Sequence, residues 1–304
     1  MTVAPIPLTP SALRAAFQER GIIPKKGLGQ NFLIDQNILH VIVEAAGLEK
    51  SDLVLEIGTG VGSLTMFLAE KVYKVLSVEI DTRLFNYAKA GLTSYANIYL
   101  LNRDILRSKT TIDQQVEDQL KDWLQEGGLR LKVVANLPYH ISTPVIIALL
   151  EGNLPIELMV LTLQRDIVDR LMASPGTKDY GILSVVARVF SEIEVLRTLP
   201  PEVFWPEPQV ESAIVRLHVR KEEACRKISN YGLFSRLVRG VFQTRRKILL
   251  NSLLMLGIPS LSKEAALEML RRLDVHPQAR GEALPLEGFI ALAKELELFG
   301  KEEG

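Results

Sequence analysis

Residues 54–62 read VLEIGTGVG, an apolar, β-rich run that ends in three glycines at alternate positions. Glycines at the carboxyl end of a strand let the backbone turn tightly and come close to a ligand. In an open α/β sheet, ligands bind at that end of the strands. A dinucleotide fingerprint would have its third glycine where this chain has Ser63, so the spacing disfavours NAD. The segment predicts a strand of an α/β sheet and the ligand loop that follows it.

Short β-rich runs alternate with amphipathic, helical ones over residues 52–163. The β-rich runs are residues 52–58, 74–80, 97–104, 131–137 and 157–163. This alternation predicts βαβ units and a parallel sheet, and the near-continuous apolar character of the runs predicts helices on both faces. Two further runs, 192–199 and 212–219, flank a proline-rich segment and are typical of a closing pair at the sheet edge. We expect a Rossmann-like α/β fold with a mostly parallel, seven-stranded sheet.

The sequence after Val219 shows helical periodicity alone. Its apolar residues recur at i, i+3 and i+4 over residues 233–243, 246–256, 263–273 and 286–296. The pattern changes near residues 220–226. We therefore expect two domains: residues 1–221, which include an N-terminal arm over 1–50, and a small, all-α domain over 222–304.

Length and composition exclude several classes of protein. The chain has 304 residues, of which 47% are apolar and 24% charged, so it is neither disordered nor fibrous. No apolar run approaches the ~18 residues that span a bilayer, and the first residues lack the features of a secretory signal. The lone Cys225 excludes an internal disulfide, and four scattered histidines show no metal-ligand spacing. We expect a cytoplasmic protein without a metal.

Basic and acidic residues balance at 36 each, but their distribution is uneven. Residues 226–247 carry seven basic side chains and no acidic one, and the arm adds Arg14, Arg20, Lys25 and Lys26. Such a run is often only the solvated face of a helix. The alternative is a surface for a polyanion such as RNA. The candidate RNA contacts are Arg236, Arg239, Arg245, Arg246 and Lys247.

Acidic residues end the second and third predicted strands. Glu79 lies where a carboxylate can accept hydrogen bonds from both hydroxyls of a ribose. Asp104 lies where its carboxylate can accept a hydrogen bond from the amino group of an adenine. An aspartate after a strand often belongs only to a turn or caps a helix. Together with the glycine loop, these acids resemble the S-adenosylmethionine site of class I methyltransferases. The resemblance implies S-adenosylmethionine as the cofactor, with Gly58, Gly60, Glu79 and Asp104 around it.

The fourth predicted strand ends in Asn136-Leu137-Pro138-Tyr139. The N6 amine of adenine is a poor nucleophile because its lone pair is delocalised into the ring. Two carbonyl acceptors can hold both N–H bonds and direct the lone pair at a methyl donor. The Asn136 side chain and the Leu137 backbone carbonyl can supply these acceptors, Pro138 fixes the turn, and Tyr139 can stack on an extruded base. We call residues 136–139 the acceptor motif. It predicts transfer of a methyl group to an adenine-like amine.

The chain resembles the ribosomal RNA small-subunit adenine dimethyltransferase family over nearly its whole length. The resemblance is carried by residues 27–33 (GLGQNFL), 203–213 (VFWPEPQVESA), 242–247 (FQTRRK), 251–253 and 280–284. It implies dimethylation of N6 in two adjacent adenosines near the 3′ end of the small-subunit rRNA, in a subunit that is being assembled. The sequence shows no obvious surface for self-association, so we expect a monomer. It adds Asn31, Leu33 and Asn136 to the expected cofactor contacts and Phe204 as a second stacking residue.

Other functions stay open. A large-subunit rRNA adenine methyltransferase of the antibiotic-resistance type shares the sheet and a similar acceptor motif. A DNA adenine methyltransferase usually has two prolines in that motif. A binding role, as a checkpoint in small-subunit assembly, can coexist with catalysis. Two residues depart from the family pattern: His140 stands where Asn is frequent, and Arg103 where Gly is common.

Overall fold

The computed structural model describes residues 6–245, 247–259 and 261–302. Its contacts divide the chain into two compact units. The first comprises the residues up to Val168 and Glu192–Val219, and the second comprises Asp169–Ser191 and the residues from Arg220 onward. The second unit therefore includes helix α8 (Ile182–Phe190), which the sequence analysis places in the larger domain. The division into domains at residue 221 stays a prediction.

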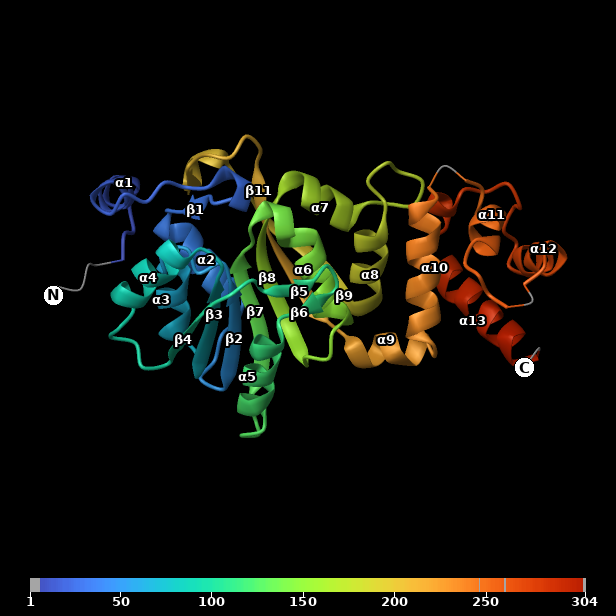
Figure 1. Cartoon of the computed structure of the whole chain (residues 1–304), viewed down its shortest axis with the longest axis horizontal. Coiled ribbons are helices and arrows are strands. Elements are labelled where there is room, and N and C mark those ends of the chain that lie inside the picture. The colour runs from blue at the N-terminus through green and yellow to red at the C-terminus, as the bar shows by residue number, and fades with distance from the viewer. Residues whose placement is uncertain (1–5, 246, 260, 303–304) are drawn as a thin grey trace. The chain divides into compact units, whose positions relative to one another are not determined.

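Seven strands of the described chain form the sheet of the first unit, in the order β4-β3-β2-β7-β8-β11-β9 (Figure 1). The five strands from β4 to β8 pair in parallel, and β11 pairs antiparallel with β8. Their bounds are β2 (Asp52–Ile57), β3 (Lys74–Glu79), β4 (Ile98–Asn102), β7 (Arg130–Asn136), β8 (Ile156–Gln164), β9 (Ser191–Leu199) and β11 (Ser212–Val219). The predicted fold class, including the closing strand pair, is confirmed.

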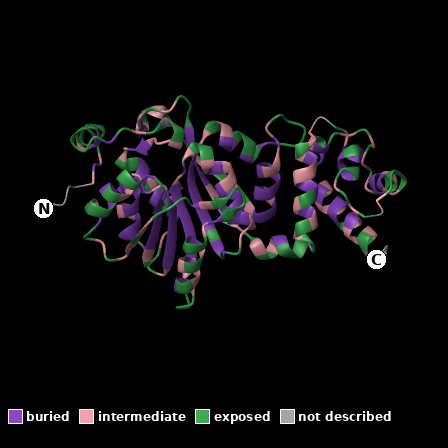
Figure 2. Cartoon of the chain, viewed as in Figure 1, coloured by how far each residue is buried: buried purple, intermediate pink, exposed green. Residues whose placement is uncertain are grey.

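The five inner strands, β3, β2, β7, β8 and β11, are buried along most of their length (Figure 2), whereas most residues of the edge strands β4 and β9 are partly or fully exposed. In β2 all six residues are buried, including Asp52, whose carboxylate pairs with Lys132 and Arg130 of β7 at 2.8 and 2.9 Å. A buried carboxylate needs such partners because removal from water penalises the charge. The ion pairs therefore allow a charged residue at the start of an otherwise apolar central strand.

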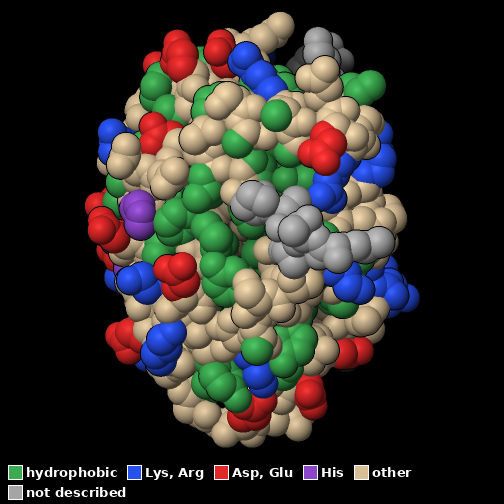
Figure 3. All heavy atoms as spheres, turned by 90° about the vertical axis from the view of Figure 1, so that its left-hand side faces the viewer, with side chains coloured by type: hydrophobic (Ala, Val, Ile, Leu, Met, Phe, Trp, Pro, Cys, Tyr) green, Lys and Arg blue, Asp and Glu red, His purple; other side chains and the backbone are tan. Residues whose placement is uncertain are grey.

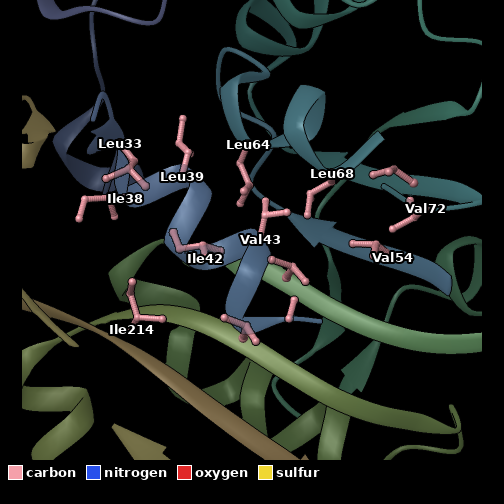
Figure 4. Close-up of a cluster of buried hydrophobic side chains, with 14 of the residues drawn as sticks. Leu33, Ile38, Leu39, Ile42, Val43, Val54, Leu64, Leu68, Val72 and Ile214 are labelled. Carbon is pink, nitrogen blue, oxygen red and sulfur yellow. The ribbon is translucent and has the colours of Figure 1, made fainter. Parts of the chain in front are cut away.

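One face of the sheet is covered by α2 (Gln36–Ala45) and α3 (Ser63–Ala69). The side chain of Asp35 caps α2 by accepting hydrogen bonds from the backbone of Asn37 and Ile38. Apolar residues at helical spacing on α2, Ile38, Leu39, Ile42 and Val43, join the same core cluster as Val54 and Ile214 of the sheet, and Figure 4 shows Ile42 and Val43 between these two strand residues. The remaining helices of this unit are α1 (Pro10–Glu19), α4 (Thr82–Gly91), α5 (Gln114–Leu124) and α6 (Tyr139–Glu151). Helix α7 (Arg165–Met172) begins in the first unit and ends in the second.

The N-terminal arm pairs with the proline-rich segment. Strand β1 (Phe32–Leu33) runs antiparallel to β10 (Phe204–Trp205), so that Phe32 faces Trp205 and Leu33 faces Phe204. A second apolar cluster joins Leu13 and Phe17 of α1 to Phe32 and to Tyr87 of α4. Segments more than 170 residues apart thus meet at the end of the sheet where ligands bind.

In the second unit, α10 (Tyr231–Gln243) packs against α8, α11 and α13. Its buried residues are Phe234, Leu237, Val238 and Val241, an i, i+3, i+4, i+7 pattern. The other helices are α9 (Lys221–Lys227), α11 (Leu249–Leu254), α12 (Lys263–Arg272) and α13 (Leu286–Glu302). Within the described ranges, no helix is both long enough and apolar enough to cross a membrane.

Candidate active site

A pocket lies at the carboxyl ends of the central strands, where the arm and the proline-rich segment also contribute to its wall. Its lining contains most of the residues predicted for the site: Asn31, Gly58, Gly60, Glu79, Asp104, Asn136, Leu137, Pro138, Tyr139 and Phe204. Leu33 is not part of this lining; it is buried in the cluster beneath α2, whereas its neighbour Phe32 lines the pocket. The reason is the alternation of β1, which directs adjacent side chains to opposite sides.

The glycine loop after β2 needs its glycines for two reasons. Gly58 and Gly60 have φ values of +83° and +58°, a backbone conformation that residues other than glycine rarely adopt. A Cβ atom on Gly60 would lie 3.2 Å from the Phe32 ring, and one on Gly58 would lie 3.4 Å from the Pro138 ring. The loop is therefore packed closely by the arm and by the acceptor motif, which leaves little room for any side chain there.

Glu79, at the end of β3, fixes the glycine loop. Its carboxylate accepts hydrogen bonds from the backbone N–H groups of Gly60 and Asp81, both at 2.8 Å. Burial raises the pKa of Glu79, and the backbone hydrogen bonds oppose that rise. Each carboxylate oxygen keeps a further lone pair for a ligand hydroxyl. This side chain can therefore hold the loop and a ribose together.

Glu56 lies in β2 beneath the same loop and is 1% exposed. The hydroxyls of Thr65 and Ser77 donate to its carboxylate at 2.6 and 2.5 Å. Burial outweighs these hydrogen bonds and raises the pKa of Glu56 to about 8. Glu56 is absent from the pocket lining among the described residues, so it links β2, β3 and α3 rather than contacting a ligand.

Two apolar residues that the sequence analysis did not single out also line the pocket. Ile80 and Ile105 directly follow the acids Glu79 and Asp104, and Ile80 is 47% exposed. An exposed isoleucine in a pocket can cover the flat face of an aromatic ring. The sequence feature that could have identified these two isoleucines is their position immediately after Glu79 and Asp104. Arg103 also lines the pocket and pairs with Asp113 at 3.4 Å, and Asp104 accepts a hydrogen bond from the backbone of Leu106 at 2.9 Å.

Asn136 ends β7, and its side-chain amide donates to the backbone carbonyl of Asn31 at 3.0 Å. A carbonyl oxygen can only accept, so the NH2 group must face Asn31 and the Oδ1 atom is left to accept from a ligand. The backbone N–H of Leu137 donates to the carbonyl of Thr162 in β8 at 3.3 Å. The arm and the neighbouring strand thus orient the acceptor motif.

Tyr139 and Phe204 both line the pocket. Tyr139 is the first residue of α6 and is 41% exposed, and its hydroxyl donates to Asp166 at 2.8 Å. Phe204 is 3% exposed and belongs to the cluster beneath α2. One aromatic ring is therefore accessible and held by a hydrogen bond, while the other is fixed by the core.

Asp81, the N-cap of α4, holds the arm over the pocket. Lys25 pairs with its carboxylate at 2.9 Å, and the Gln30 side chain donates to the same oxygen at 3.3 Å. Gln30 also accepts from the backbone N–H of Lys25 at 2.7 Å. Burial opposes ionisation of Asp81, but these hydrogen bonds and one from the Arg83 backbone lower its pKa to about 2. We call Lys25, Gln30 and Asp81 the arm clasp.

Two other basic residues of the arm, Arg14 and Arg20, lie against aromatic rings. The guanidinium of Arg14 lies 5.9 Å from the Trp205 ring centre, and that of Arg20 lies 4.8 Å from the Tyr87 ring centre. Figure 3 shows the side that carries α1 and α4, where Lys and Arg are interspersed with Asp and Glu around exposed hydrophobic side chains. The arm therefore does not present a purely basic surface.

The basic residues predicted to bind RNA differ in their surroundings. Arg236 and Lys247 are exposed, and Arg239 donates to Ser235 at 3.1 Å. Arg245 pairs with Glu282 and donates to the carbonyl of Thr177 at 2.9 Å. Arg246 lies outside the described residues. Among the side chains described, no group of three or more His, Cys, Asp or Glu residues could hold a metal ion.

A sheet of this order, with a glycine loop, an acid ending the next strand and an Asn-Leu-Pro-Tyr turn, defines a class I methyltransferase. Residues 24–297 match the model of the ribosomal RNA adenine dimethylase family, and the chain belongs to that family. The resemblance stated from the sequence is thereby confirmed.

Named relatives cover nearly the whole chain. This chain is 44% identical to the ribosomal RNA small subunit methyltransferase A of Caldanaerobacter subterraneus subsp. tengcongensis, over 91% of its own length and 99% of the relative's. A crystal structure of a dimethyladenosine transferase from Plasmodium falciparum matches with a TM-score of 0.70 and 25% identity, over 88% of this chain and 97% of that one. The 23S rRNA methyltransferase ErmE matches with a TM-score of 0.59 and 26% identity, over 88% and 100%.

Proposed function

We propose that this protein uses S-adenosylmethionine to convert two adjacent adenosines near the 3′ end of small-subunit rRNA to N6,N6-dimethyladenosine. The observation that carries the proposal is the orientation of Asn136, whose NH2 group is held by Asn31 so that Oδ1 is available to an amine. Membership of the ribosomal RNA adenine dimethylase family and a 44% identical relative named for the small subunit support the choice of RNA.

The pocket residues fit S-adenosylmethionine. Glu79 can accept from the two ribose hydroxyls, Asp104 can accept from the adenine amino group, and Ile80 and Ile105 can cover the ring. When bound, the cofactor supplies a methyl group on a positively charged sulfur. The buried Glu79 carboxylate also complements the positive charge of such a ligand.

The acceptor motif would act by orienting the target amine. In the first transfer, Asn136 Oδ1 and the carbonyl of Leu137 would each accept one N6–H bond, which favours a more tetrahedral nitrogen with an available lone pair. The singly methylated amine keeps one N–H, which one of these acceptors would hold in the second transfer. A general base is not required for the attack, because the proton becomes acidic only once the nitrogen has been methylated. The bond from the methyl carbon to sulfur would break as the new bond to nitrogen forms, which leaves a neutral thioether, and the acidic proton would then pass to water. Pro138 fixes the turn that keeps the two acceptors together.

Tyr139 and Phe204 would hold the extruded adenine between their rings. The hydrogen bond from Tyr139 to Asp166 limits rotation of the accessible ring before the base arrives. Arg236, Arg239 and Lys247 of the helical unit are the described candidates for phosphate contacts, and each contact would add to the salt dependence of RNA binding.

The test is transfer of tritiated methyl groups from S-adenosylmethionine to small ribosomal subunits that lack this modification. Purified large subunits and duplex DNA are assayed in parallel, and the products are identified by nucleoside mass spectrometry. We expect dimethyladenosine in the small-subunit RNA alone.

Other outcomes point to the alternatives. Label in large-subunit RNA would indicate the antibiotic-resistance type of enzyme, and label in DNA would indicate a DNA methyltransferase. If no substrate is labelled although the protein binds both the cofactor and the immature subunit, the proposal fails in favour of a binding role in assembly.

A further inference from the structure

Three polar side chains line the pocket on the side of Asn136 that is away from the glycine loop: Thr162, Gln164 and Ser212. Thr162 and Gln164 are two residues apart on β8, so they share one face of the sheet. Gln164 is directly opposite Ser212 of β11, and Thr162 is directly opposite Asn136 of β7. We call Thr162, Gln164 and Ser212 the polar edge of the pocket.

The polar edge lacks internal partners. Within the part of the chain that the structure describes, none of the three side chains makes a hydrogen bond with another residue. Thr162 is 2% exposed and Ser212 is 4% exposed, and the Thr162 hydroxyl is completely buried without a partner. Burial of an unpaired hydroxyl destabilises a folded protein. Neither packing nor an internal hydrogen bond therefore explains a threonine here, whereas a ligand would.

The order of the strands indicates which ligand the polar edge binds. Along the edge of the sheet, Glu79 on β3 and the glycine loop on β2 lie on one side of Asn136, and the polar edge on β8 and β11 lies on the other. If Asn136 holds the target amine between the two sides, the methyl donor occupies the β2–β3 side. The ring that carries the amine must then extend over β8 and β11.

We propose that the polar edge recognises the target adenine by donating hydrogen bonds to its ring nitrogens. Adenine presents N1, N3 and N7 as acceptors only, and the amide of Gln164 and the hydroxyls of Thr162 and Ser212 are donors. This inference rests on the proposed function and extends it, because the polar edge selects the base while Asn136 and Leu137 orient the amine.

The experiment compares Thr162→Val, Gln164→Met and Ser212→Ala with the wild type. Each change removes donors while keeping a similar or smaller side chain. For each protein we would measure the Kd for S-adenosylmethionine, the thermal unfolding midpoint, and kcat/KM with unmodified small subunits. Glu157→Gln is the matched control, since Glu157 is exposed near the opposite end of β8.

We expect kcat/KM for the subunits to fall roughly tenfold in each variant, as for the loss of one hydrogen bond to a substrate. The Kd for the cofactor should stay within about twofold of the wild type. Thr162→Val should unfold at the same or a higher temperature, because the hydroxyl has no partner to lose.

Three results would overturn this inference while leaving the proposed function intact. Unchanged kcat/KM in all variants would show that the base does not contact the polar edge. A parallel loss of cofactor affinity would place these side chains in the cofactor site. A lower unfolding temperature in Thr162→Val would assign its hydroxyl a structural role. A wild-type protein that fails to methylate small subunits would overturn the proposed function itself, and this inference with it.

Discussion

The side chain of Asn136 donates a hydrogen bond to the backbone carbonyl of Asn31, which lies 105 residues earlier in the chain. This contact joins the acceptor motif to the arm that covers the pocket. It also determines which end of the amide faces outward, because the carbonyl of Asn31 cannot donate. The conformation of the arm and the orientation of the Asn136 amide are therefore linked through this hydrogen bond.

We expect Asn136→Ala to lower kcat by about two orders of magnitude at saturating cofactor, comparable to removing one preorganised polar group from an active site. Asn136→Asp should lose activity to a similar extent, because a carboxylate would face the Asn31 carbonyl instead of donating to it. Single-turnover methyl transfer measures both effects. Near wild-type turnover in Asn136→Ala would refute the proposed alignment of the amine.

Tyr139 is expected to act mainly through its ring. Tyr139→Phe should keep most of the activity, since it keeps the ring although it loses the hydrogen bond to Asp166, whereas Tyr139→Ala should lose most of it. The measurement is kcat/KM with unmodified small subunits. The stacking role would be wrong if both variants lost activity equally; such a result would assign the function to the hydroxyl.

The arm clasp predicts a specific effect of Asp81→Asn. Asparagine can still cap α4, but it removes the negative charge that pairs with Lys25. The KM for S-adenosylmethionine should rise roughly fivefold, in line with the loss of a charge-assisted hydrogen bond. Trypsin should also cleave more rapidly after Lys25. Unchanged cleavage and unchanged KM would show that the clasp does not hold the arm in solution.

Glu56 predicts a pH dependence of stability. Its pKa is about 8 in the folded protein against an ordinary value of 4.5, so the folded state binds the proton more tightly than the unfolded chain. The free energy of unfolding therefore loses a contribution as the pH rises from 4.5 to about 8. Glu56→Gln has no such group, so its stability relative to the wild type should increase with pH.

Denaturant unfolding of both proteins at about pH 5 and about pH 8.5 measures this difference. Glu126→Gln is a suitable control, because this exposed carboxylate has a lowered pKa and lies outside the core. A stability difference between Glu56→Gln and the wild type that does not vary with pH would contradict a raised pKa at Glu56.

The sequence by itself determined the local structure and the positions of the candidate site residues at the ends of the strands. Every strand of the predicted sheet lies within two residues of its expected bounds, because apolar runs and amphipathic helices depend on nearby residues. The glycine loop, Glu79, Asp104 and the Asn136 motif were recognisable because each follows a strand of a parallel sheet, and parallel strands end at one edge.

Only the tertiary structure decided which side chains meet across long separations. It placed Phe32 rather than Leu33 in the pocket lining, paired Asp81 with Lys25, and engaged Arg245 with Glu282. It also left the hydroxyl of Thr162 buried without a partner beside Asn136. These features depend on strand pairing and on packing between distant segments, which periodicity does not encode, because a local pattern fixes the face of an element and not its neighbour.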